Sequence, residues 1–333
     1  MNKMTKLGVS ALCGSLAAVA SASAGDLTVS GGADLTWISM DDAETGNPIG
    51  IGSNFALDGS GELENGWNVA LSIAMKNKNT YSATNVTVTV PTLGDFKITS
   101  GISGTGIDRM DDVTPNVWEE AYASGLSTGI NTVAGASAGT GIEYTPNMMP
   151  DGLTARFMWA ATPTSNFNDK VAGGQNQAGT GWDVTLVATD EITGMSGLTV
   201  GGGISTVEQN ATNTGSDRDE WTAYATYAVG GFTLGYQWSE EDLGTSANEQ
   251  QYDNEGYGIT FAINDDLSIG YNNYESKQTS TTNVTAEADS IQLSYSYGGA
   301  SIRIMDASAD NMDYNTGATQ DRDNTVISLG LAF

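Results

Sequence analysis

The sequence predicts an all-β fold, a sixteen-stranded antiparallel β-barrel that spans a membrane. Three observations predict it. Segments in which apolar residues alternate with small or polar ones recur along the chain, the connections between them are alternately short and long, and tryptophans gather toward one end of the segments. The composition suits strands, because the 42 glycines can supply turns and the 6 prolines all fall in connections or at segment ends.

The composition also excludes several functions. The 333 residues include no histidine and one cysteine, which removes imidazole and thiolate metal sites, Ser-His and Cys-His catalytic pairs and any disulfide framework. The 12 Lys and Arg against 40 Asp and Glu give a net charge of −28, which excludes nucleic acid as a partner because phosphate binding requires clustered cations. We therefore expect no enzyme, no catalytic residue and no cofactor.

Residues 1–24 are predicted to be a cleaved signal peptide. Two lysines precede an apolar stretch over residues 7–20, and Ala22-Ser23-Ala24 is a small-residue cleavage motif. A retained membrane anchor is the alternative, but the apolar stretch is too short to span a bilayer as a helix. Removal of the two lysines takes the net charge to −30. Residues 25–333 form the predicted barrel.

The alternating segments are predicted strands with one apolar and one polar face. In residues 232–238, Phe, Leu, Tyr and Trp occupy one parity, while Thr, Gly and Gln occupy the other. About sixteen segments of this kind follow one another along the chain. We expect strands to start near residues 27, 53, 67, 84, 95, 140, 153, 181, 198, 220, 231, 255, 267, 288, 300 and 324.

The connections alternate in length. The short ones are rich in residues that tolerate positive φ in hairpin turns, and they span 65–66, 93–95, 230–231, 264–266 and 298–299. The long polar ones span 41–52, 104–139, 162–180, 206–219, 239–254, 275–287 and 306–323. This alternation puts the long connections on one side, as in outer-membrane barrels with short periplasmic turns and long outer loops. A soluble β-sandwich is the alternative, but its loops need not alternate.

Aromatic residues predict two girdles. If odd-numbered strands run outward, five of the 7 tryptophans lie at one height, the outer rim: Trp37, Trp159, Trp182, Trp221 and Trp238. Other aromatic residues fall toward the opposite rim: Trp67, Tyr227, Phe232, Tyr297 and Phe333. Amphipathic rings prefer the level of the lipid headgroups, so this distribution favours a membrane-spanning barrel.

The chain resembles the general porins of Gram-negative outer membranes, most closely their alphaproteobacterial-type branch, over its whole mature length. The resemblance rests on the signal peptide, the strand count, a last strand that ends in Phe333, and the long connection 104–139. That connection contains the sequence Asp108-Arg109-Met110-Asp111-Asp112-Val113-Thr114-Pro115.

The resemblance implies a location, a state of assembly and a function. It implies an outer-membrane homotrimer of sixteen-stranded barrels that lets small hydrophilic solutes and ions diffuse passively. Residues 104–139 would fold into the lumen as a constriction loop. Phe333 would be the assembly signal, read by the barrel-assembly machinery.

Parity predicts which charges face the pore. If the apolar parity faces lipid, four basic residues point into the lumen, because a cation facing lipid near the bilayer midplane costs roughly 2–4 kcal/mol: Lys76, Lys97, Arg156 and Arg303. Across from them the constriction loop would bring five acidic residues: Asp108, Asp111, Asp112, Glu119 and Glu120. Opposed charges would create a transverse field at the narrowest point. The alternative is that these charges are solvated at different heights.

Other acidic residues have lumen parity and would add negative potential along the channel: Asp34, Asp58, Glu62, Glu143 and Asp183. Within the constriction loop, Thr114 can cap a helix and Pro115 suits its first position, so we expect about two helical turns over residues 116–123. Glu119 and Glu120 would sit on that helix. A mobile outer loop is the alternative for the whole connection.

Weak cation selectivity is expected from the acidic balance. A substrate-specific channel is one alternative, but it would require a dense ladder of one charge or an aromatic track in the lumen, where only Tyr224 is expected. A surface-exposed structural or adhesive barrel is another. The outer loops are rich in Asp, Asn and Glu, so their carboxylates would be solvated or, alternatively, would bind Ca²⁺ and bridge to lipopolysaccharide. Outer-membrane lipid and lipopolysaccharide are the expected surroundings.

Overall fold

A computed structural model describes most of the mature chain. The described residues are 27–40, 48–77, 80–100, 104–138, 140–161, 178–209, 216–244, 251–279, 283–317 and 319–332. The expected signal peptide and Phe333 lie outside these ranges.

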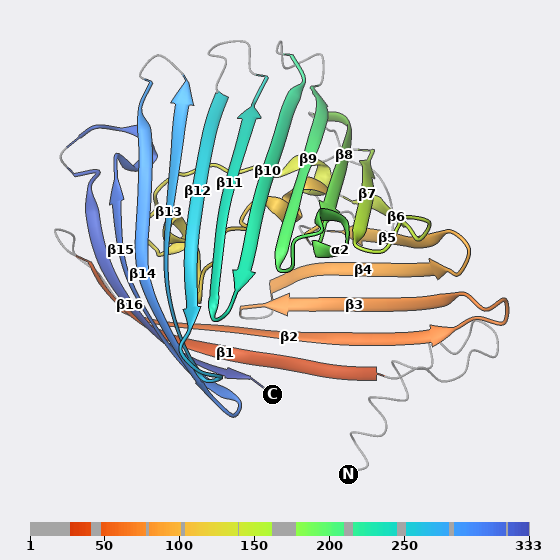
Figure 1. Ribbon diagram of the computed structural model, residues 1–333, viewed down its shortest axis with the longest axis horizontal. Coiled ribbons are helices and arrows are strands. Elements are labelled where there is room, and N and C mark those ends of the chain that lie inside the picture. The colour runs from red at the N-terminus through yellow and green to blue at the C-terminus, as the bar shows by residue number, and fades with distance from the viewer. Residues whose placement is uncertain are drawn as a thin grey trace.

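The described residues form sixteen strands that close into one antiparallel barrel (Figure 1). The strands are β1 (Leu27–Met40), β2 (Ile49–Glu62), β3 (Asn68–Lys76), β4 (Thr80–Val90), β5 (Gly94–Ser100), β6 (Gly141–Pro146), β7 (Leu153–Ala160), β8 (Ala178–Ala188), β9 (Leu198–Gln209), β10 (Arg218–Val229), β11 (Phe232–Asp242), β12 (Gln251–Ala262), β13 (Leu267–Thr279), β14 (Thr285–Tyr297), β15 (Ala300–Asp310) and β16 (Arg322–Ala332). Short helices lie in the connections: η1 (Gly106–Met110), η2 (Ala121–Ala123), η3 (Gly135–Ala138), α2 (Asp190–Thr193) and η4 (Met312–Tyr314). Within the described ranges, no helix is long and apolar enough to cross a membrane.

Each strand pairs with its neighbours in sequence, and β1 closes the barrel against β16. In that last pairing Gly32 lies opposite Ala332 and Met40 lies opposite Asn324. Closure leaves no strand edge with unpaired backbone groups, which is the condition for a sheet in lipid. The predicted strand starts are within four residues of the observed ones, with the largest differences at β2, β4 and β12. The predicted sixteen-stranded antiparallel barrel is therefore confirmed.

The short connections are built on glycine where the backbone demands it. Gly94 has φ 116°, and a Cβ there would lie 2.1 Å from the carbonyl oxygen of Thr145 on β6. Gly66 has φ 80° beside Asn65, whose side-chain oxygen accepts the N–H of Trp67 at 3.2 Å. No other residue type fits either position without strain. The β8–β9 connection is longer than the other turns on its side because it contains α2.

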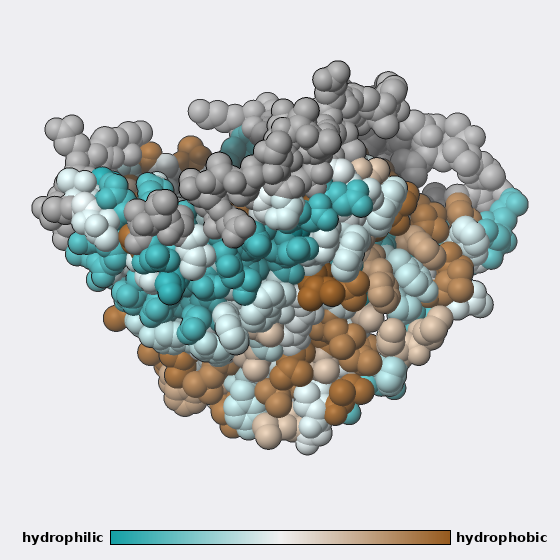
Figure 2. Space-filling model, turned by 90° about the horizontal axis from the view of Figure 1, so that it is seen from above, coloured by the Kyte–Doolittle hydropathy of each residue, from teal (hydrophilic) through white to brown (hydrophobic). Residues whose placement is uncertain are grey.

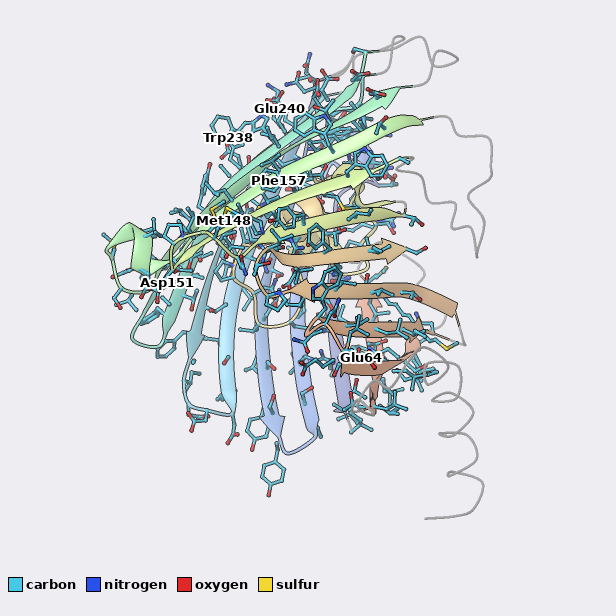
Figure 3. The ribbon with its side chains drawn as sticks, turned by 90° about the vertical axis from the view of Figure 1, so that its right-hand side faces the viewer. Glu64, Met148, Asp151, Phe157, Trp238 and Glu240 are labelled. Carbon is cyan, nitrogen blue, oxygen red and sulfur yellow. The ribbon has the colours of Figure 1, made fainter. Side chains whose placement is uncertain are left out.

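The outer wall carries an apolar belt between two rims. Large apolar side chains of outward parity are exposed all around it, among them Ile51, Phe157, Trp238, Ile291 and Leu331. Phe157 and Trp238 project from the outer side of the wall in Figure 3. Figure 2 shows hydrophobic residues gathered in one band of the surface and hydrophilic residues in another. Exposed apolar surface of this extent is the face a barrel turns to lipid.

The aromatic residues form contacts within both rims. Near the outer ends of their strands, Trp159 lies opposite Trp182, and the rings of Trp221 and Trp238 meet edge to face with centroids 5.0 Å apart. At the short-turn end, Phe232 stacks on Phe261 with centroids 4.3 Å apart. This arrangement agrees with the predicted girdles.

The outer ends of β12–β15 carry carboxylates on the outward face. Glu255, Glu275, Glu287 and Asp310 lie directly opposite one another across four neighbouring strands. Like charges in such cross-strand positions repel, so this rim is strongly anionic. Among the described residues, no group of three or more acidic side chains is arranged to hold a metal ion. Ca²⁺ at the acidic outer loops stays a prediction.

Candidate functional site

The connection between β5 and β6 lies inside the barrel, along the inner faces of β7 to β16 (Figure 1). We call its described residues 104–138 the constriction loop. Their backbone and side chains bond to inward residues of the wall, as the following contacts show. The expectation of an inward-folded loop is therefore met, and the alternative of a mobile outer loop is not.

Three buried carboxylates of the wall hold both ends of the constriction loop. Glu143 on β6 accepts the N–H of Gly106 at 2.7 Å, and Asp183 on β8 accepts the N–H of Ile107 at 3.1 Å. Asp183 also accepts the N–H of Ala136 at 3.0 Å. Hydrogen bonds to charged acceptors are stronger than neutral ones, and here they satisfy the free N–H groups at the starts of η1 and η3.

Glu220 on β10 completes this anchor. Its two oxygens accept the N–H groups of Ala134 at 3.2 Å and Gly135 at 2.5 Å. Arg218 pairs with the same carboxylate and also with Glu241. The loop approaches the wall closely here, since a Cβ at Gly135 would lie 2.7 Å from Oδ2 of Asp183 on β8. Glu220 was not among the residues predicted from the sequence, although its lumen parity in β10 was a usable signal.

The middle of the constriction loop is bonded to amide side chains of later strands. The N–H of Trp118 donates to Gln292 on β14 at 3.0 Å, and the N–H of Ala121 donates to Asn272 on β13 at 3.0 Å. These N–H groups would otherwise bond within a helix. The predicted helix over 116–123 is therefore wrong: only the single turn η2 is helical.

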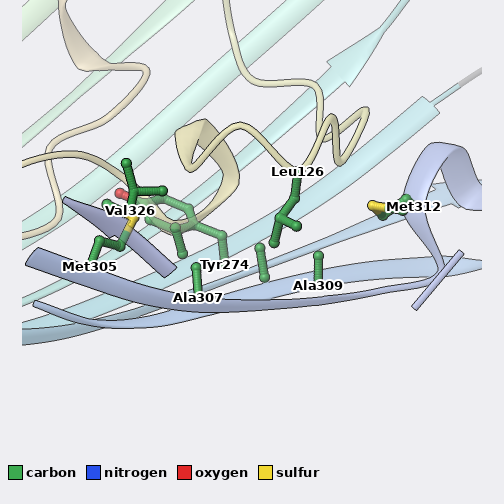
Figure 4. Packing of buried hydrophobic residues seen from close by; sticks show 9 residues of the cluster. Leu126, Tyr274, Met305, Ala307, Ala309, Met312 and Val326 are labelled. Atoms are coloured by element: carbon green, nitrogen blue, oxygen red, sulfur yellow. The ribbon is translucent and has the colours of Figure 1, made fainter. Parts of the chain in front are cut away.

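Farther along, the loop packs on the inner faces of β13, β15 and β16. Leu126 is buried against Met305, Ala307 and Ala309, in a cluster that also includes Tyr274 and Met312 (Figure 4). The carbonyl oxygen of Ser124 accepts a hydrogen bond from Asn324 at 2.8 Å. The loop is thus held along its whole length by residues far away in the sequence.

The five acidic residues of the constriction loop do not share one environment. Asp112 and Glu119 are exposed, whereas Asp108, Asp111 and Glu120 are half-buried. Asp108 is hydrogen-bonded within the loop to Ser137 and Gly104. Asp111, Asp112, Glu119 and Glu120 interact electrostatically and form the acidic cluster of the narrowing.

Burial and mutual repulsion raise the pKa of these carboxyls. Burial raises the pKa of Glu120 to about 7, with repulsion from Asp112 and Glu119 as further causes. Burial, Asp112 and Asp108 also raise the pKa of Asp111, which hydrogen-bonds to Asp112. The charge of the acidic cluster therefore changes near neutral pH.

Two of the predicted wall bases form a group with a base of the loop itself. Arg109 pairs with Glu143 at 2.5 Å, and Lys97 and Arg156 interact electrostatically with both of them. Lys97 also lies opposite Glu143 in the β5–β6 pairing. Arg109 was not predicted as a site residue, because its neighbours in sequence are acidic. Its presence means that the loop carries both signs of charge.

The other two predicted bases lie near the acidic cluster. Arg303 pairs with Asp34 on β1, and its guanidinium lies 5.2 Å from the ring centre of Trp118. Both Arg303 and Lys76 interact electrostatically with Glu119. Lys76 is exposed, as are Asp112 and Glu119, although all three lie inside the wall. Solvent therefore reaches the space between the loop and the wall.

The structure corrects two expectations about the lumen. Glu143 and Asp183 have inward parity, but they are only 3% and 1% exposed, and they hold the loop instead of lining the channel. Tyr252 and Tyr274 also point inward, so Tyr224 is not alone among inward tyrosines. Both are covered, since Tyr274 contacts the edge of Tyr122 with centroids 4.8 Å apart and Tyr252 packs on Tyr314. They form no open aromatic track.

A family model of Gram-negative porins matches residues 8–317 of the sequence. The chain belongs to the Gram-negative porins. It is accordingly an outer-membrane β-barrel and a diffusion channel. No curated protein matches the chain.

Solved porin structures share this fold. The anion-selective porin from Comamonas acidovorans superimposes with a TM-score of 0.70 at 12% identity, over 93% of this chain and 100% of that chain. The outer-membrane protein OmpT of Vibrio cholerae superimposes with a TM-score of 0.67 at 12% identity, over 95% of this chain and 99% of that chain. The superpositions establish the shared architecture. At identities this low, the ion selectivity of this porin has to be argued from its own residues.

Proposed function

We propose that this porin is a water-filled channel for small hydrophilic solutes and ions, with a weak preference for cations. The observation that carries the proposal is the exposure of Lys76, Asp112 and Glu119 inside a closed wall. Charged side chains that remain hydrated within a barrel require a continuous aqueous space around them. The constriction loop narrows that space and lines it with charge.

The balance of charge supports the cation preference. The described loop residues include five acids and one base, and the whole chain has 40 acids against 12 bases. Counter-ions accumulate according to the sign of the local potential. The positive charges of Lys97, Arg109 and Arg156 oppose the preference for cations. The structural similarity to an anion-selective porin does not support a preference for cations either. The acidic cluster therefore has to dominate at the narrowing for the proposal to hold.

The test is the reversal potential of purified protein in a planar bilayer across a KCl gradient at low ionic strength. We expect current steps and a reversal potential whose sign indicates a preference for cations. This preference should become smaller at 1 M salt, where the Debye length is about 3 Å. The double variant Asp111→Asn/Asp112→Asn should lower the preference, and Arg156→Gln should raise it. Raising the pH from 6 to 8 should strengthen it, because carboxyls such as Glu120, with a pKa of about 7, lose protons.

The matched control is Asp306→Asn/Asp310→Asn, which removes two charges from the outward face of β15 and leaves the lumen unchanged. It should keep the wild-type reversal potential. Anion preference in the wild type, or an unaltered potential in the Asp111/Asp112 variant, would contradict the assignment of the acidic cluster. A protein without current steps would contradict the channel itself and favour the adhesive barrel.

We also propose that the porin works as a homotrimer of mature chains. Strands β5, β6 and β7 have 7, 6 and 8 residues, fewer than the 9–11 that cross the hydrocarbon layer. Their outward side chains are nevertheless apolar and exposed, including Ile98, Ile142 and Trp159. Contact with further copies of the chain would cover this low wall. A trimer form of the Vibrio cholerae protein OmpT has the same fold, with a TM-score of 0.65.

Native mass spectrometry of detergent-extracted protein is expected to give three copies, each starting at Gly25. We expect three chains to associate because the short strands β5, β6 and β7 leave an apolar wall to be covered. We expect each chain to begin at Gly25 because the small-residue cleavage motif ends at Ala24. Monomers would contradict the proposed assembly. Copies that retain residues 1–24 would contradict the proposed cleavage.

A further inference from the structure

The connection between β15 and β16 contacts the constriction loop from the side opposite its carboxylate anchor. We call its described residues, 311–317 and 319–321, the clamp loop. Its short helix η4 turns inward, so that Met312 and Tyr314 are only 3% and 8% exposed. Met312 packs in the cluster that contains Leu126 of the constriction loop (Figure 4).

Two hydrogen bonds join the clamp loop to the turn at residues 127–131 of the constriction loop. The N–H of Asp313 donates to the carbonyl oxygen of Thr128 at 2.8 Å. The N–H of Asn131 donates to the hydroxyl oxygen of Tyr314 at 3.1 Å. Between them lies Gly129, with φ 71°, where a Cβ would approach Asp313 Oδ1 to 2.5 Å. The two segments are therefore in direct contact.

Tyr314 links the turn to the barrel wall. Its hydroxyl lies 2.8 Å from Ser276 Oγ on β13, and its ring lies against Tyr252 on β12 with centroids 5.2 Å apart. Burial raises the pKa of Tyr314 to about 12, so the hydroxyl keeps its proton. It can thus accept from Asn131 and donate to Ser276 at the same time. One side chain connects the clamp loop, the constriction loop and two strands.

The clamp loop holds this geometry at a conformational cost. Asn311, Asp313 and Tyr314 have φ values of 52°, 54° and 55°, in the left-handed region that non-glycine residues rarely adopt. Such residues persist where surrounding contacts determine their conformation. The contacts of Tyr314 and Asp313 with the constriction loop are of this kind.

We propose that Tyr314 is a positioning residue of the channel, which fixes the turn 127–131 against the wall and so steadies the width of the lumen. The proposal rests on the proposed function as a channel. It assigns the clamp loop a role in permeation although the loop contributes no charge to the acidic cluster. Displacing the clamp loop from the outside would release the turn and disturb the current.

The test compares single-channel currents of Tyr314→Phe and Tyr314→Ala with those of the wild type in 1 M KCl, where charge effects are screened. Tyr314→Phe removes only the hydroxyl, and we expect more open-channel noise with unchanged heat-modifiable, folded protein. Tyr314→Ala should be noisier and show additional conductance levels. Tyr297→Phe is the matched control, because Tyr297 is 76% exposed on the outer wall. This variant should have the same open-channel noise as the wild type.

A reversible cross-link separates positioning from a general loss of stability. The mature chain is expected to contain no cysteine, so Thr128→Cys/Asp313→Cys would add the only two thiols. In the Tyr314→Ala background, oxidation should suppress the noise and reduction should restore it. Thiols that stay free under oxidation, or Tyr314 variants as quiet as the wild type, would overturn the proposal. If the positioning role of Tyr314 is overturned but the wild type conducts, the proposed channel function still stands. A wild type without current would overturn both the channel function and the positioning role.

Discussion

Replacing Asp183 with alanine is expected to release the β8 side of the constriction loop and to raise the single-channel conductance. Asp183 accepts N–H bonds from both Ile107 and Ala136, and it is only 1% exposed. Hydrogen bonds to a charged group contribute about 1.5–3 kcal/mol each, so the loop would lose roughly 3–6 kcal/mol of its attachment. Since each 1.4 kcal/mol is about a tenfold change in an equilibrium, the ratio of released to attached loop should rise by about two to four orders of magnitude.

Single-channel conductance and the size limit for neutral solutes measure this release. Asp183→Asn should have a smaller effect than Asp183→Ala, because an amide oxygen can still accept one of the N–H bonds. Asp58→Asn is the control, since Asp58 is an inward acid on β2 that lines a separate hollow of the wall. Wild-type conductance and size limit in Asp183→Ala would show that the remaining contacts hold the loop without this carboxylate.

Deleting Phe333 is expected to reduce sharply the amount of folded protein in the outer membrane. The strand that precedes it in sequence, β16, pairs with both β15 and β1, so it is the strand that closes the barrel. Phe333 itself lies outside the described residues, and its role as an assembly signal is implied by the resemblance to porins.

Heat-modifiability of outer-membrane fractions on gels measures the folded protein. Leu331→Ala is the matched control, because it shortens an outward apolar side chain of the same strand and keeps the terminal aromatic residue. The control should assemble nearly as well as the wild type. Equal amounts of folded protein from the deletion and the wild type would contradict the assembly role of Phe333.

The wall was predictable because strand parity and turn chemistry are local properties. Alternation in residues 232–238 and glycine at Gly94 each depend on a few neighbouring residues. The path of the constriction loop was not predictable, because its N–H groups bond to residues such as Asn272 and Gln292, more than 150 positions away. Thr114 and Pro115 favour the start of a helix, but the hydrogen bonds of the loop to the wall stabilise a different backbone conformation.

The candidate site was predictable in composition and only partly in arrangement. Strand parity correctly predicted that the side chains of Glu143 and Asp183 point into the barrel. Parity does not show that the constriction loop covers these side chains. Arg109 was hidden among acidic neighbours, and its pairing with Glu143 depends on the fold of the loop. Clamp-loop contacts with residues 128 and 131 could not be read from either segment alone.

The order in which the chain is made gives these long-range contacts a kinetic consequence. The constriction loop precedes most of the strands that hold it, and its partners extend to Asn324 near the C-terminus, 200 positions after Ser124. Contacts between segments so far apart form late, because the entropy of closing the intervening chain has to be overcome first. The narrow part of the channel therefore matures after most of the wall. A chain stalled before its last strands have formed would have the loop without its full set of attachments.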